Sequence, residues 1–268
     1  MSIENQFLVN SFAEEGFSGN PAAVCIVEKW PSEAQMQKIA LENNLSETAF
    51  CLCLNDDSQE PQFHIRWFTP GCEVDLCGHA TLATAFILFK HYFNDAQVLH
   101  FKSRSGDLHI RKTDDFVILM DFPAYSLEEV IDEAELKEVA SALGETGKKI
   151  QTLYKGIDYV AVLKNAEDVE EFKPDFGKIA SLRGVYNLLI TAKGRKYDFE
   201  SRCFFPKEAI DEDPVTGSAH CTLGPLWAKR LGKTDLTAYQ ASARGGILHL
   251  KVGKDRVMVG GRAVEVYR

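Results

Sequence analysis

One glutamate stands where a carboxyl group could carry a proton between two carbon atoms. Glu47 lies between Ser46 and Thr48 at the start of the apolar run AFCLCL, which predicts a partly buried strand. Partial loss of solvent raises the pKa of a carboxyl group, and a carboxyl that titrates near the working pH can both accept and return a proton. A surface glutamate at a strand start is the ordinary alternative.

A cysteine and a histidine flank a glycine in the segment Cys77-Gly78-His79. His79 falls in the first turn of a predicted buried helix, where the helix dipole should lower the pKa of the imidazole and keep it neutral. A neutral imidazole can donate a hydrogen bond or pass on a proton, although a lone histidine often serves only the structure. Cys77 is a secondary candidate, because a thiolate at a helix N-terminus can be reactive.

A second group of polar residues lies in the other half of the chain. Asp213 and Ser218 flank a Pro-Val-Thr-Gly segment that ends at Gly217. Asp213 could hold a hydroxyl or amine of a substrate, and Ser218 with the neighbouring N–H groups could bind carboxylate oxygens. Alternatively, Asp213 is only a loop residue or a helix cap before Pro214.

The elements that must position these residues occur twice. Arg-x-Phe-x-Pro appears at 66–70 and again at 202–206, and each copy precedes a short acidic loop and a glycine-led helix start, at Gly78 and at Gly217. Upstream, QKIAL at 37–41 matches GKIAS at 177–181. These landmarks recur in the same order at an offset of about 140 residues, which indicates an internal duplication and two similar lobes.

Each half predicts the same series of elements, and one helix in each half is apolar on nearly all faces. Such a helix is expected to be buried. We therefore predict an α+β fold with two pseudo-symmetric lobes, each a strongly curved sheet or barrel wrapped around a central helix. The expected lobes are 1–120 and 126–259, and residues 260–268 could return to the first. The paired elements are strands 22–27 and 159–163, helices 33–40 and 174–182, strands 49–54 and 186–191, strands 64–68 and 198–205, and central helices 78–92 and 217–231, with a final strand pair at 247–252 and 256–259.

The two central helices could bind an anion at their N-termini. Unpaired N–H groups and the helix dipole favour negative charge there. If the duplication is also a spatial pseudo-dyad, the starts at Gly78 and Gly217 face each other across a cleft that would hold a small carboxylate. The alternative is that each glycine only permits tight packing.

Composition excludes several functions. Hydrophobic residues make up 45% and charged residues 26%, as in an ordinary folded protein, and the net charge of −9 argues against a nucleic-acid partner. The longest charge-free run, 76–89, is too short to span a membrane. We expect no secretory signal, because the first residues lack a basic segment followed by an apolar core. Seven cysteines without a CxxC pair favour reduced thiols in the cytoplasm and argue against zinc. We expect no metal for the same reason, and neither a dinucleotide-binding motif nor a Walker motif occurs.

Five segments taken together resemble the phenazine-biosynthesis isomerase (PhzF-like) family, a branch of the diaminopimelate epimerase-like superfamily. They are FSGNPAAV at 17–24, LSETAF at 45–50, CGHAT at 77–81, DEDPVTGSAH at 211–220 and RGG at 244–246. The resemblance implies two αβ lobes with a site in the cleft between them, cofactor-free isomerase chemistry and a homodimer.

The same resemblance assigns roles to single residues. It matches Glu47 to the catalytic glutamate of the family, and it matches His79, Asp213 and Ser218 to active-site positions. Arg244 and Gly245 fall in a motif near the cleft, where Arg244 could clamp an anion or only brace a turn. Asn20 could reach the site from the turn that precedes it.

We therefore expect a cofactor-independent isomerase that moves a proton within a small, anionic, carboxylate-bearing metabolite, with Glu47 as general base and acid. One alternative is a Cys77-assisted racemase, epimerase or dehydratase of an amino or imino acid. The second cysteine of a two-thiol epimerase would fall near Pro214, so half of that machinery is missing. The other alternative is a non-catalytic module that binds a small molecule or a protein.

Overall fold

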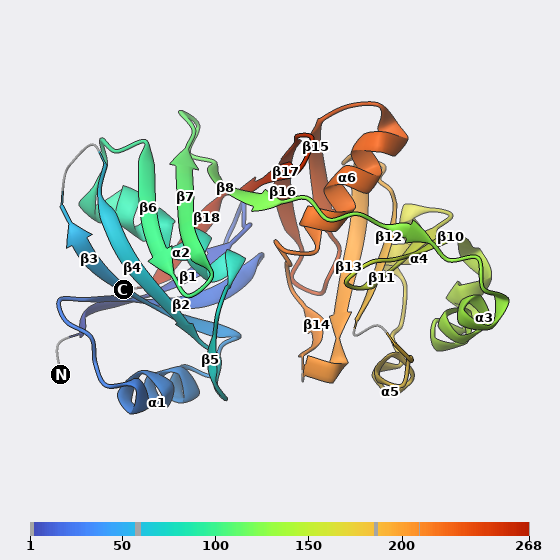
Figure 1. The fold of residues 1–268 in the computed structure, drawn as a ribbon, viewed down its shortest axis with the longest axis horizontal. Coiled ribbons are helices and arrows are strands. Elements are labelled where there is room, and N and C mark those ends of the chain that lie inside the picture. The colour runs from blue at the N-terminus through green and yellow to red at the C-terminus, as the bar shows by residue number, and fades with distance from the viewer. Residues whose placement is uncertain (1–2, 57–59, 185–186, 209, 268) are drawn as a thin grey trace. The chain divides into compact units, whose positions relative to one another are not determined.

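The chain divides into two compact units (Figure 1). The computed structural model describes residues 3–56, 60–184, 187–208 and 210–267. The first unit comprises Met1–Asp121 and Met258–Arg268, and the second comprises Phe122–Val257. The chain passes from one unit to the other within β8 (Ile118–Pro123) and returns within β17 (Arg256–Gly261).

The strands of the first unit pair side by side as a curved sheet. β18 (Ala263–Tyr267), at the end of the chain, pairs antiparallel with β1, so the C-terminal strand belongs to the first unit. The other strands are β1 (Ile3–Ser11), β2 (Asn20–Val27), β3 (Glu47–Asn55), β4 (Gln62–Phe68), β5 (Glu73–Val74), β6 (Val98–Ser103) and β7 (Gly106–Lys112).

The second unit repeats this strand arrangement. Its strands are β9 (Glu128–Glu129), β10 (Ile150–Lys155), β11 (Tyr159–Leu163), β12 (Leu188–Lys193), β13 (Phe199–Phe205), β14 (Ile210–Asp213), β15 (Asp235–Gln240) and β16 (Gly246–Val252). The predicted strand at 186–191 corresponds to β12, and Tyr186 lies outside the described residues.

The strand pairings confirm the internal duplication. In the first unit β1–β2 is antiparallel, β2–β3 parallel, β3–β4 antiparallel and β4–β6 parallel. In the second unit β10–β11, β11–β12, β12–β13 and β13–β15 follow the same sequence of directions. The fold is therefore the predicted α+β arrangement of two pseudo-symmetric lobes.

The repeated Arg-x-Phe-x-Pro motif has the same structural role in each lobe. The guanidinium group of Arg66 donates two hydrogen bonds of 2.6 Å to Glu73, and that of Arg202 donates bonds of 2.7 and 2.8 Å to Glu212. Each guanidinium also lies 5.3 Å from the ring centroid of the phenylalanine two residues later. Two-pronged pairing fixes geometry as well as charge, so each arginine ties its strand to the acidic segment that follows.

The central helix of the first unit is α2 (Gly78–Ile87), which packs against β1, β2, β3 and β18. Its residues after Gly78 are all buried, as the apolar sequence predicts. The predicted segment 78–92 does not remain α-helical, because Leu88–Tyr92 forms a π-helical turn closed by a hydrogen bond from the N–H of Phe93 to the carbonyl of Leu88.

The central helix of the second unit, α6 (His220–Leu231), begins later than predicted. Gly217 and Ser218 lie in a turn before the helix, so the expected helix start at Gly217 is wrong. The reason is a contact with β15: the amide oxygen of Gln240 accepts a hydrogen bond from the N–H of Thr216, and the next bonds, such as that from His220 to Gly217, span only three residues.

Pro225 lies inside α6 and removes one helical hydrogen bond. The carbonyl that would accept it belongs to Cys221, and it instead accepts a hydrogen bond of 3.0 Å from the N–H of Tyr125. The segment that follows β8 thereby satisfies the interrupted helix.

The remaining helices cover the sheets. α1 (Glu33–Asn43) begins with the predicted capping box, in which Ser32 and Gln35 exchange hydrogen bonds, and it buries Met36 and Ala40 against Phe50 and Phe68. The other helical segments are α3 (Glu133–Ala142), α4 (Ala166–Glu170), α5 (Phe176–Ala180) and the 3₁₀ turns Gly144–Lys149 and Pro206–Glu208.

Two features bear on the predicted environment of the protein. Among the described residues, every helix is too short or too polar to cross a membrane. All seven cysteines carry free thiols, and five of them are buried.

Candidate active site

The first turn of α2 is fixed to the strand beside it. The hydroxyl of Ser11, the last residue of β1, donates a hydrogen bond of 2.6 Å to the carbonyl of His79. Cys77 occupies the N-cap position in an extended conformation, so the helix begins at Gly78. This attachment determines where the imidazole of His79 lies in the first unit.

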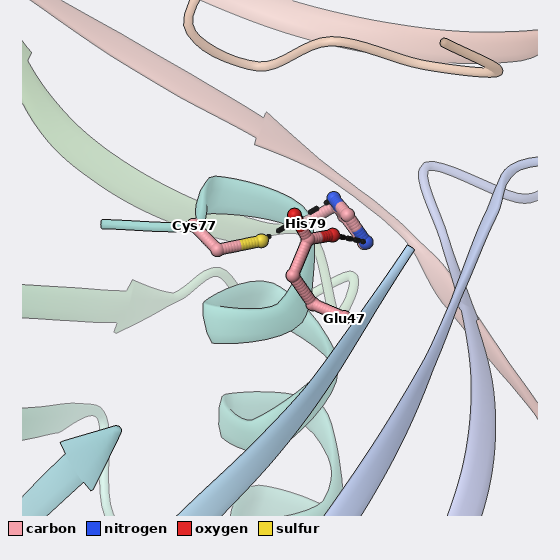
Figure 2. Close-up of side chains that lie close together, drawn as sticks. All are labelled: Glu47, Cys77 and His79. Carbon is pink, nitrogen blue, oxygen red and sulfur yellow. Dashed lines mark hydrogen bonds and ion pairs between the residues drawn. The ribbon is translucent and has the colours of Figure 1, made fainter. Parts of the chain in front are cut away.

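Glu47 approaches His79 from the sheet. It is the first residue of β3 and pairs in parallel register with Ala22 of β2. A carboxylate oxygen of Glu47 lies 3.2 Å from Nε2 of His79, and only 12% and 8% of the two side chains are exposed (Figure 2). The predicted proton carrier and the predicted neutral histidine are therefore in contact.

Cys77 lies on the other side of the same imidazole. Its Sγ is 3.5 Å from Nδ1 of His79, as Figure 2 shows. The ring thus lies between a thiol and a carboxyl group and contacts each through a different nitrogen. Because a neutral imidazole carries one N–H and one lone pair, it can accept a proton at one nitrogen while it releases another from the opposite nitrogen.

Burial keeps the imidazole of His79 neutral. Loss of solvent lowers its pKa from 6.5 to about 4, and a hydrogen bond with the Pro21 backbone acts in the opposite direction. The direction agrees with the prediction from the helix start, but the main cause is desolvation rather than the helix dipole. At neutral pH the ring is an uncharged hydrogen-bonding group.

The same three side chains are of types that bind metal ions. One ligand atom from each of Glu47, Cys77 and His79 lies within 4.8 Å of the others. However, the sulfur contacts Nδ1 and the carboxylate contacts Nε2, and these two nitrogens face away from each other on the ring. One ion can bond only one nitrogen of a ring, so this arrangement suits proton transfer better than chelation.

Asn20 lies at the start of β2 and is fully buried. It pairs with Ser11, the residue that holds the first turn of α2. The preceding Gly19 has a φ of +74°, and a Cβ atom there would collide with the carbonyl oxygen of Ser11. Glycine is therefore required for the turn that delivers Asn20 to this position.

The structure thus gathers Glu47, Cys77 and His79 and places Asn20 two residues before the register partner of Glu47. Gly78 begins the helix that carries His79. The remaining predicted site residues belong to the second unit, and they are grouped there around one loop.

Asp213 is the buried last residue of β14. Its carboxylate accepts a hydrogen bond of 2.6 Å from the hydroxyl of Thr216, and its carbonyl accepts one of 2.7 Å from the amide of Gln240. Gly217 is buried in the turn that follows, whereas Ser218 is exposed. The Asp213 loop is therefore held from within by its own threonine and by β15.

The Arg244-Gly245 turn is attached to the same loop. The hydroxyl of Ser242 donates a hydrogen bond of 2.7 Å to the carbonyl of Pro214 and accepts one from the N–H of Gly245. Gly245 has a φ of +65°, and a Cβ atom there would collide with the Tyr239 hydroxyl. Arg244 is half-buried in this turn.

Sequence reasoning missed the residues that hold the site residues in place. Hydrogen bonds to distant parts of the chain are made by Ser11, Gln240 and Ser242. Thr216 bonds both distant Gln240 and nearby Asp213. Two of them had a local signal: Thr216 lies inside the Pro-Val-Thr-Gly segment, and Ser242 comes two residues before Arg244. Ser11 and Gln240 had none.

The chain is similar to proteins of one family over nearly its whole length. The family model described as phenazine biosynthesis-like protein (PhzC-PhzF) matches residues 9–268. An uncharacterized isomerase from Pseudomonas aeruginosa is 45% identical, with 96% of this chain and 94% of that protein covered. A phenazine biosynthesis-like domain-containing protein 2 from Mus musculus is 40% identical, with coverages of 97% and 96%.

A solved structure extends this similarity to three dimensions. A PhzF family protein from Enterococcus faecalis matches with a TM-score of 0.90 and 48% identity. The match covers 97% of this chain and 96% of that one. The residues matched by the family model, 9–268, include both groups of predicted site residues.

Proposed function

Because the chain belongs to the phenazine biosynthesis-like (PhzC-PhzF) family and is an isomerase, we propose that it moves a proton within a small carboxylate-bearing metabolite. Glu47 is the general base and acid in this proposal, and no cofactor takes part. The observation that carries the proposal is the 3.2 Å contact between the Glu47 carboxylate and Nε2 of His79.

The contact supports different roles for His79 and Glu47. When a neutral His79 carries its proton on Nε2, a small rotation of the ring would let it donate a hydrogen bond to the nearby carboxylate of Glu47 and orient that carboxylate for the substrate. A carboxyl group held in this way can reach two neighbouring carbon atoms on one face of a substrate. General acid–base catalysis by such a group contributes about 10²- to 10⁴-fold to a rate.

The proposed reaction conserves every atom and charge. The carboxylate of Glu47 takes a proton from a carbon next to an unsaturated group, and the electrons of the broken C–H bond move into the adjacent π-system. The resulting carboxylic acid then returns the proton at another carbon of that system. The double bond changes place, and the enzyme ends in its starting protonation state.

The substrate carboxylate can be held at the start of α2. This helix has ten residues, and the N–H groups of Gly78 and His79 belong to its first turn, where helical geometry provides no internal acceptor. These groups attract an anion without a cluster of basic residues, which suits a chain of net charge −9. It stays a prediction that Asp213, Ser218 and Arg244 contribute to the same site. The homodimer also stays a prediction.

A second role is favoured for Cys77 by its contact with His79. A thiol that donates its hydrogen to Nδ1 places the single ring proton on Nε2, facing Glu47. Cys77 is then a positioning residue that selects the tautomer of His79. If Cys77 itself removed the substrate proton, the reaction would be the racemisation, epimerisation or dehydration expected of a thiol enzyme.

Isotope exchange tests these roles directly. The protein is incubated in D₂O with a panel of cyclic hydroxy, amino and imino acids, and NMR follows the loss of carbon-bound protons. We expect exchange with at least one acid, its loss in Glu47→Gln and its retention in Glu42→Gln, which alters an exposed glutamate of α1. Exchange that survives Glu47→Gln but is lost in Cys77→Ser would replace the carboxyl mechanism by the thiol mechanism.

A further inference from the structure

Two histidines face each other across a hairpin of the first unit, away from the Glu47 site. His100 of β6 and His109 of β7 are direct register partners in an antiparallel pair. Their Nδ1 atoms lie 2.8 Å apart, and their rings are nearly perpendicular, at 82°. Figure 1 shows the two strands side by side.

The pair lies on the outer face of the sheet. Leu99 and Ile110, the neighbours of the two histidines along their strands, are buried, whereas His100 is half-buried and His109 exposed. Because successive side chains of a strand point to opposite faces, both imidazoles project outward. Solvent therefore has access to them.

The two nitrogens are close enough to bind one ion. With metal–nitrogen bonds of about 2.0–2.1 Å, two ligands at a right angle lie about 2.9 Å apart, and two at the tetrahedral angle lie about 3.3 Å apart. The 2.8 Å between the Nδ1 atoms is the length of a hydrogen bond, so modest rotations of the two rings would turn both nitrogens toward a shared ion. Two imidazole nitrogens completed by water form the mixed nitrogen and oxygen set that is typical of tetragonal Cu²⁺ and Ni²⁺, whereas structural Zn²⁺ usually takes four protein ligands.

We propose that His100 and His109 form a surface site for a tetragonal transition-metal ion, Cu²⁺ or Ni²⁺, bound through both Nδ1 atoms. Water completes the coordination shell. The site is independent of the isomerase chemistry. Asp107, two residues before His109 on the same face, adds a nearby negative charge, and Lys102, its register partner, partly offsets it.

Binding requires a shift of protons but no net release from neutral rings. In the hydrogen-bonded pair one ring carries its proton on Nδ1 and donates it to the Nδ1 of the other. When the ion binds, the donor ring moves that proton to Nε2 through solvent, so both Nδ1 lone pairs are available. The hydrogen bond between the rings is exchanged for two metal–nitrogen bonds.

Calorimetric titration of tag-free protein with Ni²⁺ tests the proposal. We expect one ion per chain, with at least about a tenfold loss of affinity in either His100→Gln or His109→Gln, because each variant removes one of two linked ligands. The matched control is His64→Gln on β4, whose ring packs edge-on against Trp30. It should bind as the unchanged protein does.

Copper is titrated into the Cys53→Ser/Cys72→Ser variant, because these two thiols are exposed and would react with Cu²⁺. In this variant the electron paramagnetic resonance spectrum of bound Cu²⁺ should show coupling to two nitrogens. Circular dichroism checks that each variant is folded.

Several results would overturn the site. Absence of Ni²⁺ binding to the unchanged protein, unchanged affinity in both pair variants, or an equal loss in His64→Gln would each do so. Tighter binding of Zn²⁺ than of Ni²⁺ would overturn the assignment of the ion class, because the argument from the ligand set would then be wrong.

Discussion

Nε2 of His79 lies 3.2 Å from a carboxylate oxygen of Glu47, although one residue begins a strand and the other lies in the first turn of a helix. The parallel pairing of β2 with β3 fixes the position of Glu47, and the hydrogen bond from Ser11 fixes that of His79. Their contact is therefore held by two independent backbone attachments, which is the kind of support that a proton-transferring pair needs.

Shortening the glutamate should separate binding from chemistry. Glu47→Asp keeps the charge but withdraws the carboxylate by one methylene group, which breaks the contact with His79. We expect kcat to fall by about 10²- to 10⁴-fold, with a small change in KM, because the lost interaction serves proton transfer. Steady-state kinetics with an acid that exchanges protons measures both constants. A loss confined to KM would instead assign Glu47 to substrate binding.

Acid should destabilise the protein through its two buried histidines. Burial lowers the pKa of both His79 and His220 from 6.5 to about 4. Between these values the unfolded chain binds protons that the folded chain does not. The stability that the two neutral histidines contribute is therefore present above pH 6.5 and is lost as pH falls towards 4. Each histidine should lower the free energy of unfolding by roughly 2 kcal/mol between pH 6.5 and 5.

Urea unfolding at pH 7.5, 6.5 and 5.0 measures this effect. His220→Gln should remove about half of the histidine contribution to the loss between pH 6.5 and 5. His91→Gln, which changes a histidine paired with Glu265 near the surface, serves as the control. The same pH dependence in the unchanged protein and in His220→Gln would show that His220 is not a source of the acid sensitivity.

Gly19 should be far more sensitive to substitution than its neighbour Gly16. Gly19→Ala forces a Cβ atom against the carbonyl of Ser11 at a φ of +74°, whereas a Cβ atom at Gly16 meets no atom within 4 Å in the part of the chain described. We expect Gly19→Ala to lower the free energy of unfolding by about 1–3 kcal/mol and to reduce activity, because Asn20 and Ser11 must shift. Gly16→Ala should change stability by no more than about 0.5 kcal/mol. Equal effects in the two variants would mean that the turn is not constrained.

The sequence could predict the elements whose signals are local. Apolar runs marked the strands β2, β3, β4, β11 and β13, and Ser32 with Gln35 marked the start of α1. The glycine-flanked motifs pointed to Glu47, Cys77 and His79, which the structure brings together. The duplication could be recognised because the Arg-x-Phe-x-Pro motif occurs twice, and each copy makes the same Arg–Glu attachment.

Features set by distant contacts could not be predicted. The segment from Gly217 was expected to begin the helix because it leads into an apolar run, but the hydrogen bond from Thr216 to Gln240 of β15 holds the chain in a turn until α6 begins. The neutrality of His79 was expected from the helix dipole, whereas the main cause is burial by the surrounding sheet. Both outcomes depend on tertiary packing, which a short sequence segment does not encode.

The two repeated arginines should differ in their contribution to stability. The side chain of Arg202 is 9% exposed, and its guanidinium donates to Glu212 and to the carbonyls of Val169 and Phe172. Arg202→Met leaves these acceptors buried without that donor, so we expect a loss of about 3–5 kcal/mol in the free energy of unfolding. Arg202→Lys keeps the charge but cannot reproduce the two-pronged geometry, and should cost about 1–3 kcal/mol.

Arg66 is the matched comparison, because its partner Glu73 also lies 2.7 Å from Arg104. After Arg66→Met the carboxylate of Glu73 keeps this second cation, and Arg66 is already 17% exposed. We therefore expect a smaller loss, about 1–2 kcal/mol, measured by the same urea titration. When Arg104→Ala is already present, the loss in the free energy of unfolding caused by Arg66→Met should rise towards the loss caused by Arg202→Met. If the two costs instead add independently, Arg104 does not compensate for Arg66, and the difference between the lobes has another origin.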